Sequence, residues 1–188
     1  MNIEIEAKLK VDSLEKVEHK LTEIGAEFGQ EQLHLDSYFD DENKTFKKGD
    51  RCLRLRWQLV GKNERFFLTY KGAKEKDDFK KRQEVEIVIE DGDSAEKLLL
   101  LLGYNKVLVF EKKRRIWRFG QCEVALDELP LLGSFVEIEG HDDGKIADVQ
   151  KSLGLSKLPV ILESYASLMG KKLRQLGKKE KEVFFIKT

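Results

Sequence analysis

Short segments in which charged and apolar residues alternate recur along most of this 188-residue chain. The first, Asn2 to Lys10, reads NIEIEAKLK and carries Glu4, Glu6 and Lys8 at every second position. Residues two apart in a β-strand point to the same side of the sheet, so this strand has one charged face and one apolar face. The chain is therefore expected to build a sheet whose two faces differ sharply in polarity.

The same parity separates charged from apolar residues in five later segments, RCLRLRW, RFFLTYK, RQEVEIVIE, QCEVALDEL and SFVEIEG. Polar or glycine-rich stretches separate these segments, as expected for antiparallel strands and their turns. Their charged sides carry Arg54, Arg56, Thr69, Lys71, Arg82, Glu84, Glu86, Asp127, Glu137 and Glu139. We therefore expect an antiparallel sheet with a continuous charged face.

Four amphipathic segments are predicted to be helices that cover the apolar face. The first begins after Asp12 or Ser13 and ends at Gly25. The second, DSAEKLLLLLG, has Asp93 and Glu96 as a capping box and is expected to bury its leucine side. The last two cover roughly residues 145–153 and 159–176. With helices on the apolar side, the charged face either looks outward as an open sheet or lines a closed barrel, which also removes edge strands.

Length and charge limit the partners of this chain. Its 188 residues suffice for one domain, placed at residues 1–176, followed by a charged and apolar tail at 177–188. Lys and Arg number 35 and Asp and Glu number 35, so no net charge attracts nucleic acid or an anionic membrane. We expect a cytoplasmic protein, because no apolar run suits a membrane helix and the two cysteines lack a CxxC spacing or a leader peptide. For the tail, an edge strand, a homodimer contact and disorder all remain open.

An inward charged face is costly unless its charges pair with one another or bind ions. Carboxylates that cluster without His or Cys suit a hard cation such as Mg²⁺ or Mn²⁺, and Arg and Lys suit the phosphate oxygens that such a cation bridges. The pattern therefore predicts a metal-assisted site for a small polyphosphate. The competing interpretation is a solvated face with cross-strand ion pairs, each contributing about 0.2–1 kcal/mol.

Several motifs, taken in order, resemble those of the CYTH superfamily, the triphosphate tunnel metalloenzymes. The matching residues are Glu4, Glu6 and Lys8 for ExExK, Arg54 and Arg56 for R-x-R, Lys71 in LTYKG, Arg82, Glu84 and Glu86 in RQEVEIVI, and Lys112 and Arg114 for K-x-R in EKKRRIW. HLDSYFD resembles the family's second strand, and ALDELPLLGSFVEIE resembles a late segment of the adenylyl cyclase branch. A one-residue slip in the four consecutive basic residues would instead select Lys113 and Arg115.

The resemblance implies an α+β fold, in which an eight-stranded antiparallel β-barrel forms a tunnel and helices pack on its outside. It implies that the basic residues bind a triphosphate, with catalytic roles for two lysines, and that the acidic residues bind Mg²⁺ or Mn²⁺. The implied substrate-binding residues are Lys8, Arg54, Arg56, Lys71, Arg82, Lys112 and Arg114, of which Lys8 and Lys71 are catalytic. The implied metal ligands are Glu4, Glu6, Asp127, Glu137 and Glu139, with Glu84 and Glu86 as further tunnel acids.

The nucleophile decides which reaction such a site performs. With water as the nucleophile the enzyme is a triphosphatase, and with a ribose 3′-hydroxyl as the nucleophile it is a class IV adenylate cyclase. A non-catalytic barrel that binds polyphosphate is the third alternative. We expect hydrolysis, because some class IV cyclases carry a His-Phe pair upstream of ExExK that this sequence lacks, although SYASLM resembles the cyclase branch. A base or thiazolium pocket could use Tyr38, Phe39, Trp57 or Trp117, for which core or surface packing is the alternative.

Overall fold

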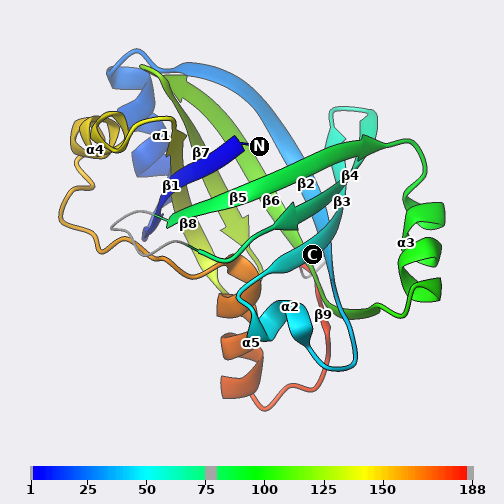
Figure 1. Ribbon diagram of the computed structural model, residues 1–188. Coiled ribbons are helices and arrows are strands. Elements are labelled where there is room, and N and C mark those ends of the chain that lie inside the picture. The colour runs from blue at the N-terminus through cyan, green and yellow to red at the C-terminus, as the bar shows by residue number, and fades with distance from the viewer. Residues whose placement is uncertain (1, 75–79, 186–188) are drawn as a thin grey trace.

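Eight antiparallel strands close into a barrel in the computed structural model of this chain, with helices outside it (Figure 1). The structure describes residues 2–74 and 80–185, except for the side chains of residues 2–4 and 80. The barrel strands are β1 (Asn2–Lys10), β2 (Glu27–Asp40), β3 (Cys52–Val60), β4 (Asn63–Lys71), β5 (Lys80–Ile89), β6 (Asn105–Phe119), β7 (Cys122–Leu129) and β8 (Gly133–Gly140). They follow the order β2-β3-β4-β5-β1-β8-β7-β6, and β6 pairs with β2 to close the ring. The predicted α+β barrel is confirmed.

The barrel closes through its two longest strands. β2 has 14 residues and β6 has 15, and they pair antiparallel from Glu27 opposite Arg118 to Asp40 opposite Asn105. Two irregularities in their register are typical of bulges, which bend a strand pair and increase its twist. Because the ring is closed, none of the eight strands is left as an exposed edge of the sheet.

Two helices cover the apolar outer face of β1, β7 and β8. These are α1 (Leu14–Glu23) and α4 (Asp143–Ser152), which share one hydrophobic core with the three strands. Val17 and Leu21 of α1 are buried in this core, as predicted from their helical spacing. Since alternate residues of a strand point to opposite sides, burying the apolar side outside the barrel turns the charged side of the same strands inward.

The helix caps match the sequence prediction in one case and differ in another. Ser13 caps α1, and its side chain accepts a hydrogen bond from the backbone amide of Lys16. Asp91 caps α3 (Gly92–Leu101), so the capping box predicted for Asp93 and Glu96 is wrong. The Asp91 side chain accepts bonds from the amides of residues 93 and 94, which places the helix start two residues earlier.

The leucine run of α3 is mostly exposed, contrary to the predicted burial. Leu99 is buried beside Phe39 and Leu55, whereas Leu98 is 58% exposed and Leu101 is 78% exposed. Successive residues of a helix are about 100° apart, so a run of consecutive leucines spreads around the helix and cannot lie on one face. A short helix against the curved barrel wall buries only the narrow stripe that contains Leu99.

The last helix begins later than predicted. α5 (Tyr165–Gln175) starts at Tyr165 rather than at Pro159, with Ser164 as its cap. The segment before it runs beside β1, where the amide of Ile161 donates to the backbone oxygen of Lys8 at 2.8 Å. This contact outside the helix explains the delayed start, and α5 then lies at one end of the barrel (Figure 1).

Two short elements complete the described chain. α2 (Thr45–Lys48) lies in the loop before β3, and β9 (Glu182–Val183) pairs parallel with β6. Val183 of this strand is buried, and a homodimer contact through the tail stays a prediction. Among the described residues, the helices are too short and too polar for any of them to span a membrane.

Candidate functional site

The charged faces of the barrel strands line a cavity of about 550 Å³. Twelve of the predicted site residues line it, namely Glu6, Lys8, Arg54, Arg56, Lys71, Arg82, Glu84, Glu86, Lys112, Arg114, Glu137 and Glu139. Of the other two, Asp127 lies behind the cavity lining, and the side chain of Glu4 lies outside the described part of the chain. The alternating pattern thus places its charges inward, on the lining of a barrel.

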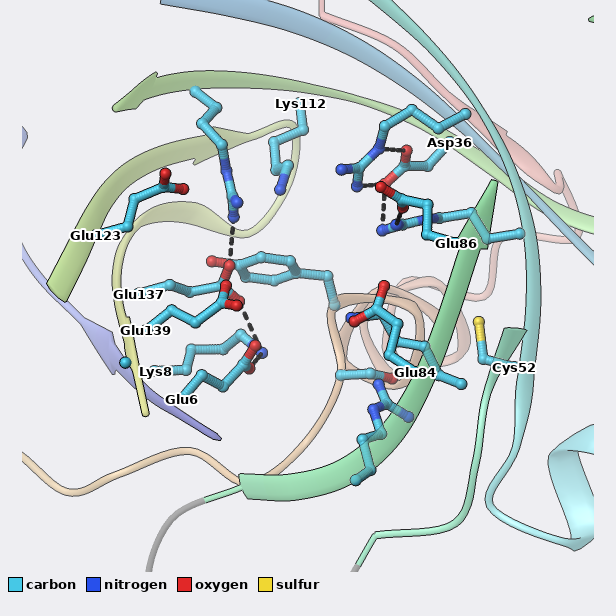
Figure 2. Close-up of a pocket in the computed structure, with 18 of the residues that line it drawn as sticks. Glu6, Lys8, Asp36, Cys52, Glu84, Glu86, Lys112, Glu123, Glu137 and Glu139 are labelled. Atoms are coloured by element: carbon cyan, nitrogen blue, oxygen red, sulfur yellow. Dashed lines mark hydrogen bonds and ion pairs between the residues drawn. The ribbon is translucent and has the colours of Figure 1, made fainter. Parts of the chain in front are cut away.

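Four carboxylates from three neighbouring strands form one side of the cavity, called here the acid wall. They are Glu6 of β1, Glu137 and Glu139 of β8, and Glu123 of β7 (Figure 2). Glu6 is paired in register with Glu139, and Glu139 with Glu123, so three carboxylates follow one another across the strands. Cross-strand neighbours have Cβ atoms about 4.5–5.5 Å apart, close enough for like charges to repel. Such a row gains stability from a cation.

Lys8 supplies a cation at the foot of the acid wall. Its ammonium lies 3.0 Å from Glu6 Oε1 and 3.0 Å from Glu137 Oε1, and it donates to the backbone oxygen of Glu163 at 3.1 Å. Burial would lower the pKa of Lys8, but Glu6 and Glu137 outweigh burial and raise the pKa above its usual value. Lys8 therefore stays charged near neutral pH.

Basic residues of the consecutive strands β3, β4 and β5 form another part of the cavity lining, called here the cationic wall. They are Arg54, Arg56, Lys71 and Arg82. Arg56 donates two hydrogen bonds to Asp36 of β2, Nε to Oδ1 at 2.6 Å and Nη2 to Oδ2 at 2.8 Å. The buried Nε of Arg54 finds no acceptor among the described residues, which leaves a donor that an anion in the cavity could satisfy.

β6 contributes Lys112 and Arg114 to the cavity. Their neighbour Arg115 points away and pairs with Glu18 of α1, so the structure favours this register over the slipped alternative. Burial, followed by the guanidinium of Arg114, lowers the pKa of Lys112 to about 7. A cation so crowded by other cations is stabilised by a nearby anion.

Asp127 anchors these basic residues from beneath the cavity. It is fully buried and accepts hydrogen bonds from Arg114 Nε at 2.7 Å, Lys112 Nζ at 3.4 Å and the Tyr165 hydroxyl at 2.8 Å. Its oxygens are thus engaged by the protein. The sequence motif had implied a metal ligand here, and the contacts favour an anchoring role.

Three residues of the site did not figure in the sequence prediction: Asp36, Glu123 and Tyr165. Tyr165 comes from α5, and its ring centroid lies 4.4 Å from the Lys8 ammonium. Its position could not be read from strand parity because it lies on a helix distant in sequence. Glu123 shares its parity with Asp127, and Asp36 shares its parity with Tyr38, so alternation was a usable signal for both.

The four aromatic candidates for a base or thiazolium pocket differ in position. Tyr38 lines the cavity and stacks one ring face on Phe110. Phe39 and Trp117 are buried in the cores outside the barrel, and Trp57 donates to Glu64. Core and surface packing thus account for three of the four.

The acid wall has the chemistry of a site for a hard divalent cation. Among the described side chains, no three His, Cys, Asp or Glu residues converge closely enough as they stand to hold a metal ion. Glu6, Glu137 and Glu139 nevertheless offer carboxylate oxygens on one side of the cavity, the donors that Mg²⁺ and Mn²⁺ prefer. The chemistry of the donor set thus fits such an ion.

Comparisons with known proteins identify relatives along most of the chain. The model of the CYTH domain matches residues 2–165. A protein of Methanocaldococcus jannaschii named "Putative adenylate cyclase MJ0240" is 32% identical over 177 residues, which cover 89% of this chain and 99% of that protein. The structure of the PH1819 protein from Pyrococcus horikoshii OT3 is 31% identical with a TM-score of 0.78, covering 90% of this chain and 99% of that one. The PH1012 protein of the same organism is 26% identical with a TM-score of 0.74, covering 86% and 96%.

Proposed function

This chain belongs to the CYTH family, and we propose that it is an Mg²⁺- or Mn²⁺-dependent enzyme that hydrolyses a triphosphate held in the barrel cavity. The observation that carries the proposal is a single cavity lined both by clustered carboxylates, which Figure 2 shows gathered on one side, and by Arg and Lys side chains of β3, β4 and β5. A protein that only bound a polyphosphate would gain nothing from carboxylates facing its anionic ligand. A bound cation on those carboxylates turns the repulsion into attraction.

The cationic wall has the role of holding the phosphate chain. Arg54, Lys71 and Arg82 present donors to the cavity from three neighbouring strands, so one extended polyphosphate can contact several of them at once. Charge-assisted hydrogen bonds of this kind are stronger than neutral ones, and guanidinium groups bind phosphate oxygens with two donors. The buried Nε of Arg54, which finds no acceptor in the part of the chain that the structure describes, and the ammonium of Lys112 on β6, which lies close to other cations, both support an anionic ligand in the cavity.

The acid wall has the role of holding the metal. Glu6, Glu137 and Glu139 would bind the ion, together with Glu4 from the same strand as Glu6, and Glu123 extends the wall. A divalent cation supplies charge that stabilises the phosphoryl oxygens as negative charge develops on them. Lys8 adds a fixed positive charge beside it. Because its pKa is raised, Lys8 acts electrostatically and not as a general base.

Water is the simpler nucleophile for this cavity. Cyclisation needs the ribose 3′-hydroxyl held in line with the α-phosphorus, and such ordering can account for several kcal/mol of barrier. Of the described aromatic residues that line the cavity, Tyr38 stacks on Phe110 and Tyr165 packs on Lys8. Ring faces engaged by the protein are less available to a nucleobase. These contacts favour hydrolysis.

A class IV adenylate cyclase is the second candidate. The name of the M. jannaschii relative, which this chain matches over 99% of its length, favours it. The two reactions share the triphosphate, the metal and the walls, and they differ in the attacking oxygen and in the products.

One assay separates the candidates. Purified protein is incubated with inorganic tripolyphosphate, ATP or thiamine triphosphate, with Mg²⁺, with Mn²⁺ or with EDTA, and phosphate and cyclic AMP are measured in parallel. We expect metal-dependent phosphate release without cyclic AMP. Cyclic AMP as the main product would instead establish the cyclase. No turnover of any substrate, together with binding of tripolyphosphate in a separate titration, would leave a polyphosphate-binding barrel.

A further inference from the structure

The carboxylates that face the cationic wall are of two kinds, and Asp36 represents the first. Its side chain is 2% exposed and accepts two hydrogen bonds from Arg56 in a bidentate arrangement. Releasing this guanidinium would leave a carboxylate buried without its main partner, which is strongly unfavourable. Asp36 therefore fixes Arg56 permanently.

Glu86 represents the second kind. Its Oε2 lies 3.3 Å from Arg54 Nη2 and accepts a hydrogen bond from Thr69 Oγ1 at 2.7 Å. The Glu86 side chain is 38% exposed, whereas that of Arg54 is 10% exposed. The carboxylate can thus turn toward water and regain hydration while the guanidinium stays in the cavity.

Glu84 repeats this arrangement one step along the same face of β5. Its Oε2 lies 2.7 Å from Lys71 Nζ, and its side chain is 20% exposed against 11% for Lys71. In the register of β4 and β5, Glu84 is paired with Lys71 and Glu86 with Thr69. Two carboxylates on one strand therefore contact two cations of the wall that would hold the phosphates.

We propose that Glu84 and Glu86 are competing carboxylates, which pair with Lys71 and Arg54 and are displaced when a polyphosphate binds these two cations. This inference rests on the proposed function. Phosphate oxygens and carboxylate oxygens compete for the same donors, so the cations exchange one anionic partner for another. The competition weakens the hold of the cavity on the triphosphate and on its phosphate products, which favours product release.

Isothermal titration calorimetry of the full chain with inorganic tripolyphosphate, in buffer with EDTA, tests the proposal. Glu86→Gln removes the competing charge and keeps the shape of the side chain. We expect the variant to bind tripolyphosphate about 1.5- to 5-fold more tightly than the wild type, the effect of one partly exposed ion pair. Glu84→Gln removes the carboxylate beside Lys71 and should also tighten the binding of tripolyphosphate, which tests the proposal a second time at a different cation.

The matched control is Glu90→Gln, which removes one negative charge at an exposed position just beyond the end of β5. It should change the affinity for tripolyphosphate less than Glu86→Gln does. Asp36→Asn should act in the opposite direction and weaken binding, because Arg56 loses its anchor. Thermal melting of each variant verifies that it is folded.

The outcomes separate this proposal from the proposed function. If the wild type binds tripolyphosphate and neither Glu84→Gln nor Glu86→Gln tightens binding beyond Glu90→Gln, the competition is refuted, while phosphate release by the wild type still supports the enzyme. If wild type and both variants fail to bind tripolyphosphate in EDTA, the competition is refuted, whereas the proposed function fails only if none of the three triphosphates is turned over with Mg²⁺ or Mn²⁺.

Discussion

The ammonium of Lys8 lies 4.4 Å from the centre of the Tyr165 ring, although the two residues belong to the first strand and the last helix of the chain. The Tyr165 hydroxyl in turn donates to Asp127 at 2.8 Å. One side chain of α5 thus contacts a cation beside the acid wall and the anchor of the β6 cations. The C-terminal helix is therefore part of the site and not only a cover for the barrel.

Two substitutions of Tyr165 should separate the contribution of its ring contact with Lys8 from that of its hydrogen bond to Asp127. Tyr165→Phe keeps the ring over Lys8 and loses the hydrogen bond to Asp127, whereas Tyr165→Leu loses both. A cation–π contact contributes about 0.5–2 kcal/mol and a hydrogen bond to a charged group about 1.5–3 kcal/mol. We expect kcat/KM for triphosphate hydrolysis to be lower in Tyr165→Phe than in the wild type, and lower still in Tyr165→Leu. Equal activity of Tyr165→Leu and the wild type would show that α5 does not support the site.

Removing one carboxylate of the acid wall should abolish metal-dependent turnover without unfolding the barrel. In Glu6→Gln the side chain keeps its size but loses the charge that a divalent cation requires. The measurement is phosphate release over a titration of Mg²⁺ or Mn²⁺, with circular dichroism as the folding control. Glu4→Gln should behave in the same way. Full turnover in excess EDTA would contradict the assignment of this wall to a metal.

Truncating the guanidinium groups of β3 should weaken triphosphate binding much more than monophosphate binding. Arg54→Ala loses charge-assisted hydrogen bonds, so we expect a loss of about 10- to 100-fold in triphosphate affinity. Arg56→Ala should add a loss of stability, because it leaves Asp36 buried without its partner. Calorimetric titration with both ligands provides the comparison. Equal losses for the two ligands would mean that these residues do not recognise a chain of phosphates.

Acid should destabilise the protein partly through Asp36. Burial would raise the pKa of this carboxyl, but Arg56 and Arg54 outweigh burial and hold the pKa well below its usual range. A lowered pKa in the folded state means that the stabilisation is present above about pH 4, the value for an unfolded Asp, and is lost as the pH falls below it. Urea unfolding between pH 7 and pH 3 measures this loss.

Asp36→Asn is the variant that isolates the contribution of this carboxylate. At pH 7 it should lower the free energy of unfolding by about 3–5 kcal/mol, because the Arg56 side chain, only 13% exposed, loses its charged partner. Its stability should also depend less on pH below 4 than that of the wild type. Parallel pH profiles for the two proteins would show that another group causes the acid sensitivity.

The lining of the cavity could be predicted from sequence because side chains along a strand alternate between the two faces of the sheet with a period of two residues. Once the outer helices bury residues such as Leu9 and Val136, their neighbours Lys8 and Glu137 have to face inward. The same reasoning did not predict Tyr165, since a helix brings it to the cavity from a distant part of the chain. Tertiary packing, which local periodicity does not encode, determines that contact.

Three helix predictions were wrong: the capping box of Asp93 and Glu96, the buried leucine side, and the helix start at Pro159. The leucine run from Leu98 to Leu102 suggested a buried face, and Pro159 suggested the first position of a helix. Both signals are local, and neither specifies which residues the barrel contacts. Of the leucines of α3, only Leu99 is buried against the barrel. The amide of Ile161 donates a hydrogen bond to the backbone oxygen of Lys8 before α5 begins.

Hydrolysis in water enriched in ¹⁸O tests the central claim most directly. Purified protein is incubated with ATP and Mn²⁺ in H₂¹⁸O. The products are separated by chromatography, and their masses are measured by mass spectrometry to detect incorporated ¹⁸O. If water is the nucleophile in the barrel cavity, the inorganic phosphate released carries one ¹⁸O atom and cyclic AMP is absent. Unlabelled pyrophosphate in equal amount to cyclic AMP would contradict the account, because the attacking oxygen would then be the ribose 3′-hydroxyl.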